Sequence, residues 1–181
     1  MLAYVSGFVY HFSEDPSIVR FVPHVPRSNP TQAPAVWGID GDHAPLYWFP
    51  RDCPPVTAWA RNDTERAEFH RAFCTAADRF HAIEVGWLHA MQATTLYGYT
   101  VDASFFRPWS EASGQWISES IIEPVHVDPV GALLERHADA AIELRIVPSL
   151  WPVHDLAVAE RWDFSIVRLS NAHAPQPSRS G

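Results

Sequence analysis

The sequence has few cysteines, few basic residues and no long hydrophobic run. Its 181 residues include two cysteines, too few for a disulfide framework, so we expect free thiols in a reducing compartment. Lys and Arg number 13 against 21 Asp and Glu, a net charge of -8, which argues against a broad basic surface for nucleic acid. The apolar start, residues 1–12, lacks the basic segment and cleavage site of a signal peptide and is too short to span a bilayer. We therefore expect a cytoplasmic protein that binds neither nucleic acid nor membranes.

Three common catalytic signatures are also missing. The chain contains no G-x-G-x-x-G loop, no phosphate-binding P-loop and no G-x-S-x-G elbow. It is instead 47% hydrophobic and 13% aromatic, well above the content of disordered chains and enough for a globular core. We expect an N-terminal extension at residues 1–9, a single globular domain at 10–171 and a mobile tail at 172–181.

Apolar alternation and turn residues predict more strands than helices. The expected strands are residues 9–12, 35–39, 56–60, 96–101, 115–122, 142–147 and 164–169. Most of them are not joined by helical crossovers, which disfavours a doubly wound parallel sheet. The predicted fold is a single α+β domain with a mixed, largely antiparallel sheet and a few flanking helices.

Capping residues mark the expected helices. Asp15 before Pro16 predicts a short helix start, residues 42–48 a short helix interrupted near Pro45, and Asp128-Pro129 the opening of another helix. The clearest helix begins near Asn62, where a glutamate three residues later completes a capping box. Its apolar stripe consists of Phe69, Phe73, Ala76 and Phe80.

Residues 36–54, VWGIDGDHAPLYWFPRDCP, hold the densest group of functional side chains. Tyr47 and Trp48 bring flat aromatic area, and Arg51 brings positive charge. Cys53 lies beside that arginine and is a candidate nucleophile, although an Asp-Cys-Pro-Pro sequence more often forms a structural corner. We interpret the run as one wall of a cleft.

Histidine spacing does not predict a metal site. His70 and Cys74 lie four residues apart on the expected helix and could share an ion. His81 follows seven residues later, roughly 10 Å along a helix, and is too distant to complete that site. A polar stripe beside the phenylalanines is the favoured interpretation.

Two polar residues sit within apolar strand patterns. Alternation in the 115–122 strand places Glu119 with Ile117 and Ile121, so the carboxylate should pair with a cation, face a cleft or lie at an exposed edge. His11 belongs to the apolar strand 9–12 and is either a satisfied core histidine or a site residue. The three alternatives for Glu119 and the two for His11 stay open.

Four segments carry a resemblance to known proteins. The runs YHFSEDPSIVRFVPH, VWGIDGDHAPLYWFPRDCP, HAIEVGWL and IELRIVPSLWP resemble a family of bacterial proteins of unknown function, over most of residues 10–171. Pro55 stands where that family pattern has a basic residue, which weakens an anion site there. More distantly, the order of parts is similar to the ADP-ribosyltransferase superfamily: a His in a Tyr-His-Phe-Ser strand, a Tyr on a following helix and a Glu on a late strand.

That distant resemblance implies roles for three residues. His11 would bond the nicotinamide-side ribose, Tyr47 would stack on the nicotinamide, and Glu119 would orient the ribose while positive charge develops at its anomeric carbon. Ser120 or Glu123 could take the place of Glu119. Further contacts to the nucleotide would come from Ser13, Trp37, Trp48 and Arg51. NAD would be a substrate, and no bound cofactor is implied.

The leading hypothesis is therefore a transferase or hydrolase with an ADP-ribosyltransferase-like cleft that acts on NAD or a related small molecule. The alternative is a non-catalytic module that binds a small molecule or a partner in a tryptophan-rich cleft. Its walls would come from residues such as Trp37, Trp48, Trp109 and Trp116. A third hypothesis is a different reaction in the same cleft. The oligomeric state and the acceptor are not indicated by the sequence.

Overall fold

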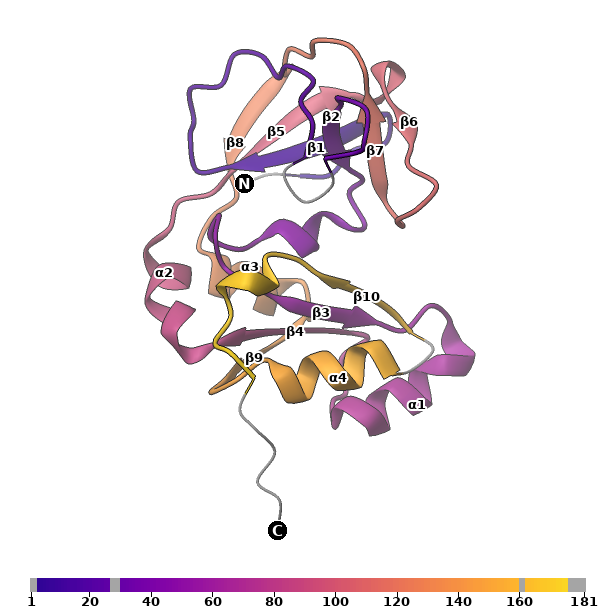
Figure 1. The fold of residues 1–181 in the computed structure, drawn as a ribbon, viewed down its shortest axis with the longest axis vertical. Coiled ribbons are helices and arrows are strands. Elements are labelled where there is room, and N and C mark those ends of the chain that lie inside the picture. Colours follow the sequence, from indigo (N-terminus) through magenta and orange to yellow (C-terminus); the bar gives the residue numbers. More distant parts are fainter. Residues whose placement is uncertain (1–2, 27–29, 160–161, 176–181) are drawn as a thin grey trace. The chain divides into compact units, whose positions relative to one another are not determined.

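The computed structural model describes residues 3–26, 30–159 and 162–175, and its chain divides into two compact units. The first unit combines Met1–Trp48 with Thr95–Gly131, and the second combines Phe49–Thr94 with Ala132–Gly181. The α+β class with mostly antiparallel strands is confirmed, and the strands form two sheets, one in each unit (Figure 1). None of the helices in the described residues has the length and apolarity needed to cross a membrane.

The first unit is built on a six-stranded antiparallel sheet in the order β6-β7-β2-β1-β5-β8 (Figure 1). Its elements are β1 (Phe8–Ser13), β2 (Val36–Ile39), η1 (Ala44–Tyr47), β5 (Tyr97–Asp102), η3 (Ala103–Phe105), β6 (Arg107–Pro108), β7 (Gln115–Ser118) and β8 (His126–Pro129). A buried cluster covers one face of this sheet and contains Val9, Val36, Val101, Phe106 and Ile122.

The described part of the expected N-terminal extension packs into this unit. Phe8 and Val9 belong to β1, and Val9 is 1% exposed. The Tyr4 ring meets the Tyr10 ring edge-on, with centroids 4.7 Å apart, and stacks against Trp48. These contacts explain why the apolar start of the chain is part of a core.

The second unit is built on a four-stranded sheet in the order β10-β3-β4-β9, in which only the β4–β9 pair is parallel. Its elements are β3 (Val56–Trp59), α1 (Asp63–Phe73), β4 (Arg79–Glu84), η2 (Val85–Trp87), α2 (Leu88–Ala93), α3 (Leu133–Asp139), β9 (Glu143–Val147), α4 (Trp151–Ala159), β10 (Asp163–Ile166) and η4 (Leu169–Asn171).

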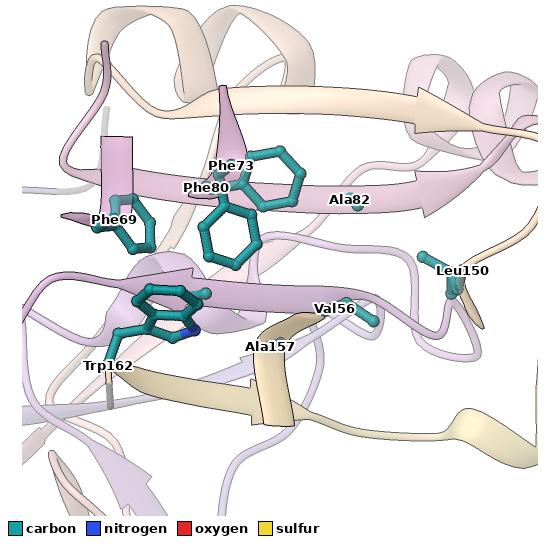
Figure 2. Packing of buried hydrophobic residues seen from close by; sticks show 9 residues of the cluster. Val56, Phe69, Phe73, Phe80, Ala82, Leu150, Ala157 and Trp162 are labelled. Carbon is teal, nitrogen blue, oxygen red and sulfur yellow. The ribbon is translucent and has the colours of Figure 1, made fainter. Parts of the chain in front are cut away.

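Helices α1 and α4 cover one face of this second sheet (Figure 1), and its main core consists of buried residues from the helices and the strands (Figure 2). Phe73 lies at the centre of an aromatic group, with its ring centroid 4.7 Å from Phe69, 4.8 Å from Phe80 and 5.1 Å from Trp162. All four side chains are nearly inaccessible to solvent. Aromatic rings at these separations add attraction beyond the area that they bury.

The start of α1 is confirmed and its predicted extent is wrong. Asn62 caps the helix by accepting hydrogen bonds from the Thr64 and Glu65 amides. The helix ends at Phe73 because Cys74 takes a left-handed conformation with φ 50. Phe80 belongs to β4 and joins the phenylalanines from there. A helix followed by a strand therefore produced what read as one helical stripe.

Four other boundaries differ from the prediction. The segment at Asp15 forms a turn in which its carboxylate accepts the Ser17 amide, without a helix after it. The strand expected at 115–122 ends at Ser118, and Asp128 lies in a strand, with the helix starting at Leu133. The strand expected at 164–169 ends at Ile166.

The expected C-terminal tail is described only in part. Ala172 donates its amide to Leu169, and the His173 amide donates to the Glu84 carboxylate at 3.0 Å. These contacts attach the described residues 172–175 to the second unit. The predicted mobility of residues 176–181 falls outside the described residues.

Candidate functional site in the first unit

The first unit does not bring His11 and Tyr47 together. Side chains alternate along β1, so His11 and Phe12 lie on opposite faces of the sheet. The Tyr47 ring stacks on Phe12, with centroids 6.4 Å apart and planes 6° apart. The His11 ring instead packs against Phe21 at 4.5 Å, and its Nδ1 donates to the Trp37 carbonyl at 3.0 Å. We call these surfaces the His11 face and the Phe12 face.

The predicted nucleotide contacts are divided in the same way. Ser13 lies on the His11 face, is 7% exposed and accepts the Asp15 amide through its hydroxyl. Trp37 is two residues from Ile39, the partner of Tyr10, and so lies on the Phe12 face. Trp48 is 2% exposed and donates its indole N–H to the Tyr4 hydroxyl at 2.8 Å. Arg51 is exposed on a turn of the second unit.

A groove with a volume of about 320 Å³ lies on the Phe12 face, where β7 pairs with β6. It is lined by Thr31, Gln32, Ala33, Pro34, Ala35, Arg107, Trp109, Glu111, Ile117 and Glu119. Small-molecule sites begin at roughly this size and combine an apolar surface with a few polar groups. This composition makes the groove the candidate site of the unit.

Glu119 reaches the groove from just beyond the end of β7. Its carboxylate lies 3.5 Å from an Arg107 nitrogen, and the two side chains are 71% and 61% exposed. The expected alternation with Ile117 and Ile121 does not extend to it, because the strand has ended and Ile121 is itself 58% exposed. Glu119 is therefore exposed, paired with a cation and part of the groove lining, so the three alternatives for this residue do not exclude one another.

Trp109 lines the groove, and Trp37 packs against it from outside the lining. The Trp37 and Trp109 rings meet edge-on with centroids 5.3 Å apart. Ile117, which pairs with Trp37 across the strands, is 3% exposed and adds an apolar surface. Of the other two tryptophans in the expected cleft, Trp48 is buried against Tyr4 and Trp116 packs against the core on the His11 face.

Two buried donors in this region have no hydrogen-bond partner among the described residues. One is the side-chain nitrogen of Gln32, which lines the groove, and the other is the indole nitrogen of Trp37. A buried donor without an acceptor is costly. An acceptor on a bound molecule would remove that cost for Gln32 only if the amide turned its nitrogen toward the groove.

Farther along the Phe12 face, β7 meets η1. The Gln115 amide donates to the Tyr47 hydroxyl at 3.3 Å. His43 Nδ1 lies 2.8 Å from an Asp40 carboxylate oxygen, which also accepts the His43 amide at 2.8 Å. Burial raises the pKa of Asp40, but the hydrogen bonds from His43 outweigh that effect and leave the pKa below its usual value. This dyad orients the imidazole beside η1.

Cys53 in the second unit is a structural residue. The thiol is fully buried, and burial raises its pKa to about 12, with Arg168 lowering it and Glu84 raising it further. A thiol with so high a pKa supplies almost no thiolate nucleophile at neutral pH. Its amide closes a turn onto Pro50 and its carbonyl accepts an Arg168 N–H at 3.3 Å. The structural-corner interpretation therefore fits.

The second unit also contains a buried histidine pair. His137 Nδ1 donates to the Leu133 carbonyl at 2.7 Å, so its Nε2 accepts from His81 Nδ1 at 3.1 Å. Burial lowers the pKa of His81 well below its usual value, and the neighbouring His137 and Arg79 lower it further. Burial also lowers the pKa of His137, against the effect of its bond to Leu133. Both rings pack against Phe49.

In the described residues, no group of three or more His, Cys, Asp or Glu side chains is arranged to hold a metal ion. His70 Nε2 lies 3.0 Å from Asp78, which also pairs with Arg66 at 2.9 Å. Cys74 directs its sulfur to the Arg71 carbonyl. The polar-stripe interpretation of this helix is consistent with these contacts.

Sequence reasoning did not identify Arg107, Gln32 or Glu111 as site residues. Arg107 lies on a strand of two residues, too short for alternation to detect, and Gln32 lies in a proline-rich segment. The sequence signal that was present is Arg-Pro-Trp at 107–109, a cation two residues before an aromatic ring in a sheet. That spacing places both side chains on one face if the segment is extended.

Comparison with known proteins gives one family match. A family described as "Family of unknown function (DUF6886)" matches residues 10–172. No curated protein and no solved structure matches the chain.

Proposed function

The chain belongs to the DUF6886 family of unknown function, and we propose that its first unit is a small-molecule binding module. The ligand lies in the groove on the Phe12 face. The observation that carries this proposal is the combination of an apolar floor, Trp109 and Ile117, with the charges of Arg107 and Glu119 in one concave surface. Apolar walls give such sites affinity, and a few polar groups orient the ligand.

The balance of evidence favours binding over catalysis. His11 and Tyr47 lie on opposite faces of the sheet, so they do not converge on a nucleotide. The Asp40–His43 dyad could orient a base, but the groove contains neither residue. Binding requires only the side chains that line the groove.

The test is a ligand-observed NMR screen of small anions, cations, zwitterions and neutral aromatics against the whole chain. Trp109→Ala should abolish binding of every ligand specific to the groove, because it removes the aromatic wall. Phe105→Ala is the matched control, since Phe105 is a 62% exposed aromatic residue of the same unit that does not line the groove. Ligands that bind equally to both variants, or no ligands at all, would contradict the proposal.

ADP-ribosyl transfer is the second hypothesis. It is favoured by the order of His11, Tyr47 and Glu119 along the chain, and it requires NAD to bind and nicotinamide to be released. We expect neither a thermal shift with NAD nor nicotinamide in the reaction mixture. Release of nicotinamide that is lost in Glu119→Gln would reverse the preference between the two hypotheses.

A further inference from the structure

The groove contains both signs of charge around an apolar floor. We infer that its ligand is a small zwitterion, of which a free α-amino acid with an apolar side chain is the simplest form. This inference rests on the proposed function and adds the chemical class of the ligand. Three parts of the groove carry it: an anion-binding side, a cation-binding side and the wall between them.

The anion-binding side is formed by Arg107 and Gln32. The guanidinium is 61% exposed and holds its carboxylate partner at 3.5 Å, long for a charge-assisted bond. The buried Gln32 nitrogen has no acceptor among the described residues. A ligand carboxylate offers two acceptor oxygens, so it can receive hydrogen bonds from the guanidinium, and from Gln32 once that amide turns toward the groove. A neutral ligand would leave the guanidinium without a new partner.

The cation-binding side is formed by Glu119 and Glu111, with the Trp109 ring beside them. An ammonium group is attracted both to carboxylates and to the face of an indole ring. Both carboxylates belong to exposed residues, so ligand binding does not have to release them from a buried network. The groove has two carboxylates and one guanidinium, and this excess of negative charge disfavours a ligand that carries only a negative charge.

The wall between the anion-binding and cation-binding sides is apolar, and it determines the kind of group that the ligand carries between its two charges. Ile117 is 3% exposed, and Pro34 and Ala33 also line the groove. An apolar side chain on the ligand would bury its surface there. The volume of about 320 Å³ lies at the lower end of the range of roughly 300–1,000 Å³ for small-molecule sites. It suits a single amino acid better than a nucleotide.

A zwitterion can also replace the ion pair between Arg107 and Glu119 without changing the net charge of the groove. The pair opens, the ligand carboxylate takes the guanidinium and the ligand ammonium takes the glutamate, so two closer ion pairs replace one long pair. An anionic ligand could pair with Arg107 but would leave Glu119 without a cation. A cationic ligand could pair with Glu119 but would leave Arg107 without an anion. The geometry therefore selects against singly charged molecules.

The experiment measures binding of three probes to the whole chain by calorimetry and ligand-observed NMR. L-Leucine carries both charges, L-leucine amide lacks the carboxylate, and N-acetyl-L-leucine lacks the ammonium. We expect each derivative to bind at least about tenfold more weakly than L-leucine, because each loses a charge-assisted bond. Binding of L-leucine should be lost in Trp109→Ala.

Two variants assign each charge to its partner. In Arg107→Gln, L-leucine and L-leucine amide should bind with equal affinity, and in Glu119→Gln, L-leucine and N-acetyl-L-leucine should do so. Arg20→Gln and Glu14→Gln are matched controls, because both residues are exposed in the same unit and neither lines the groove. These controls should preserve all the differences between the probes.

The outcomes separate the inference from the proposed function. If a singly charged probe binds as tightly as L-leucine and depends on Trp109, the zwitterion is overturned and the binding module stands. The same holds if none of the three probes binds while the wider screen yields another ligand that depends on Trp109. If nothing in either experiment depends on Trp109, both proposals fail.

Discussion

His81 shows what a buried, neutral side chain requires of its surroundings. It is fully inaccessible, it donates to His137, and its Nε2 has no partner among the described residues. Arg79, two residues earlier, opposes its protonation, and the Leu133 carbonyl fixes the tautomer of its partner. Such a pair is compatible with folding only while both imidazoles are neutral.

We therefore expect the protein to lose stability as the pH falls below about 6.5, the usual pKa of an unfolded histidine. The folded pKa of His81 is depressed, so the unfolded chain takes up a proton that the folded chain refuses. Stability is complete above that pKa and decreases below it, by up to about 1.4 kcal/mol per pH unit for each such histidine. Urea unfolding at pH 7.5 and 5.5 measures the change, in a range above the titration of ordinary carboxylates.

The variant His81→Leu should be less stable at pH 7.5 because His137 loses its partner, and its stability should depend less on pH. His126→Gln is the control, since His126 is a 67% exposed histidine of the first unit. An unchanged pH dependence in His81→Leu would show that the acid sensitivity has another origin.

The two thiols should react at very different rates. Cys74 is exposed, whereas Cys53 is fully buried and burial raises its pKa to about 12. With a disulfide reagent at pH 8, we expect one thiol per chain, that of Cys74, to react rapidly under native conditions. The second thiol, that of Cys53, should react only after unfolding. Cys74→Ser should remove the fast equivalent. Rapid reaction of that variant would mean that Cys53 is accessible.

At the scale of elements, the turn into β7 depends on one glycine. Gly114 has φ +74, and an added Cβ would lie 2.2 Å from the His43 ring. Gly131 also has a positive φ, of +99, but an added Cβ would meet nothing within 4 Å. Gly114→Ala thus combines backbone strain with a collision, while Gly131→Ala has the strain alone.

We expect Gly114→Ala to lower the free energy of unfolding by at least about 1–3 kcal/mol more than Gly131→Ala, the usual cost of overpacking. Chemical denaturation of the two variants gives the difference. Equal losses would show that His43 moves aside freely, and that its bond to Asp40 does not fix the ring.

Local patterns of apolar residues, turn residues and caps located several elements. The strands around Val9, Val36 and Val56 were located within about a residue of their ends, and Asn62 was identified as a cap. Strand β4 was missed because its residue Phe80 continues the helical spacing of Phe69 and Phe73, so the strand was assigned to the preceding helix. Division into two sheets depends on pairing between distant segments, which no local window contains.

The residues of the candidate site were also predictable only as far as local sequence allows. Trp37, Trp109 and Glu119 were identified from residue type, and each lies in or beside the groove. The sequence did not show that His11 lies apart from these residues. Its surroundings depend on Phe21, and those of the opposite face on Tyr47, and both come from other segments of the chain. Residue chemistry is readable from sequence, whereas convergence requires the fold.

At the scale of the molecule, each unit has its own buried cluster, around Val9 and Val101 in the first and around Phe73 in the second. Phe73→Ala should therefore lower stability by about 3–5 kcal/mol, as core phenylalanine truncations do. We expect faster amide hydrogen exchange mainly in residues 49–94 and 132–175, the segments of the second unit.

Val101→Ala is the reciprocal variant, because Val101 is 1% exposed in the first unit. It should increase exchange mainly in residues 3–48 and 95–131. Uniform increases across both units in both variants would mean that the chain unfolds as a single cooperative body, despite its two cores.

The alternation of the chain between its units has a consequence for synthesis on the ribosome. Strand β1 pairs along its whole length with β5, and the entire first segment of the second unit lies between them in sequence. At about 5–20 residues per second, β1 and its other neighbour β2 are therefore made several seconds before β5, and the edge of β1 that pairs with β5 lacks its partner strand for that time. The second unit cannot be completed any earlier, since β9 and β10 come later still. This strand pairing thus leaves few folded intermediates open to the chain during translation.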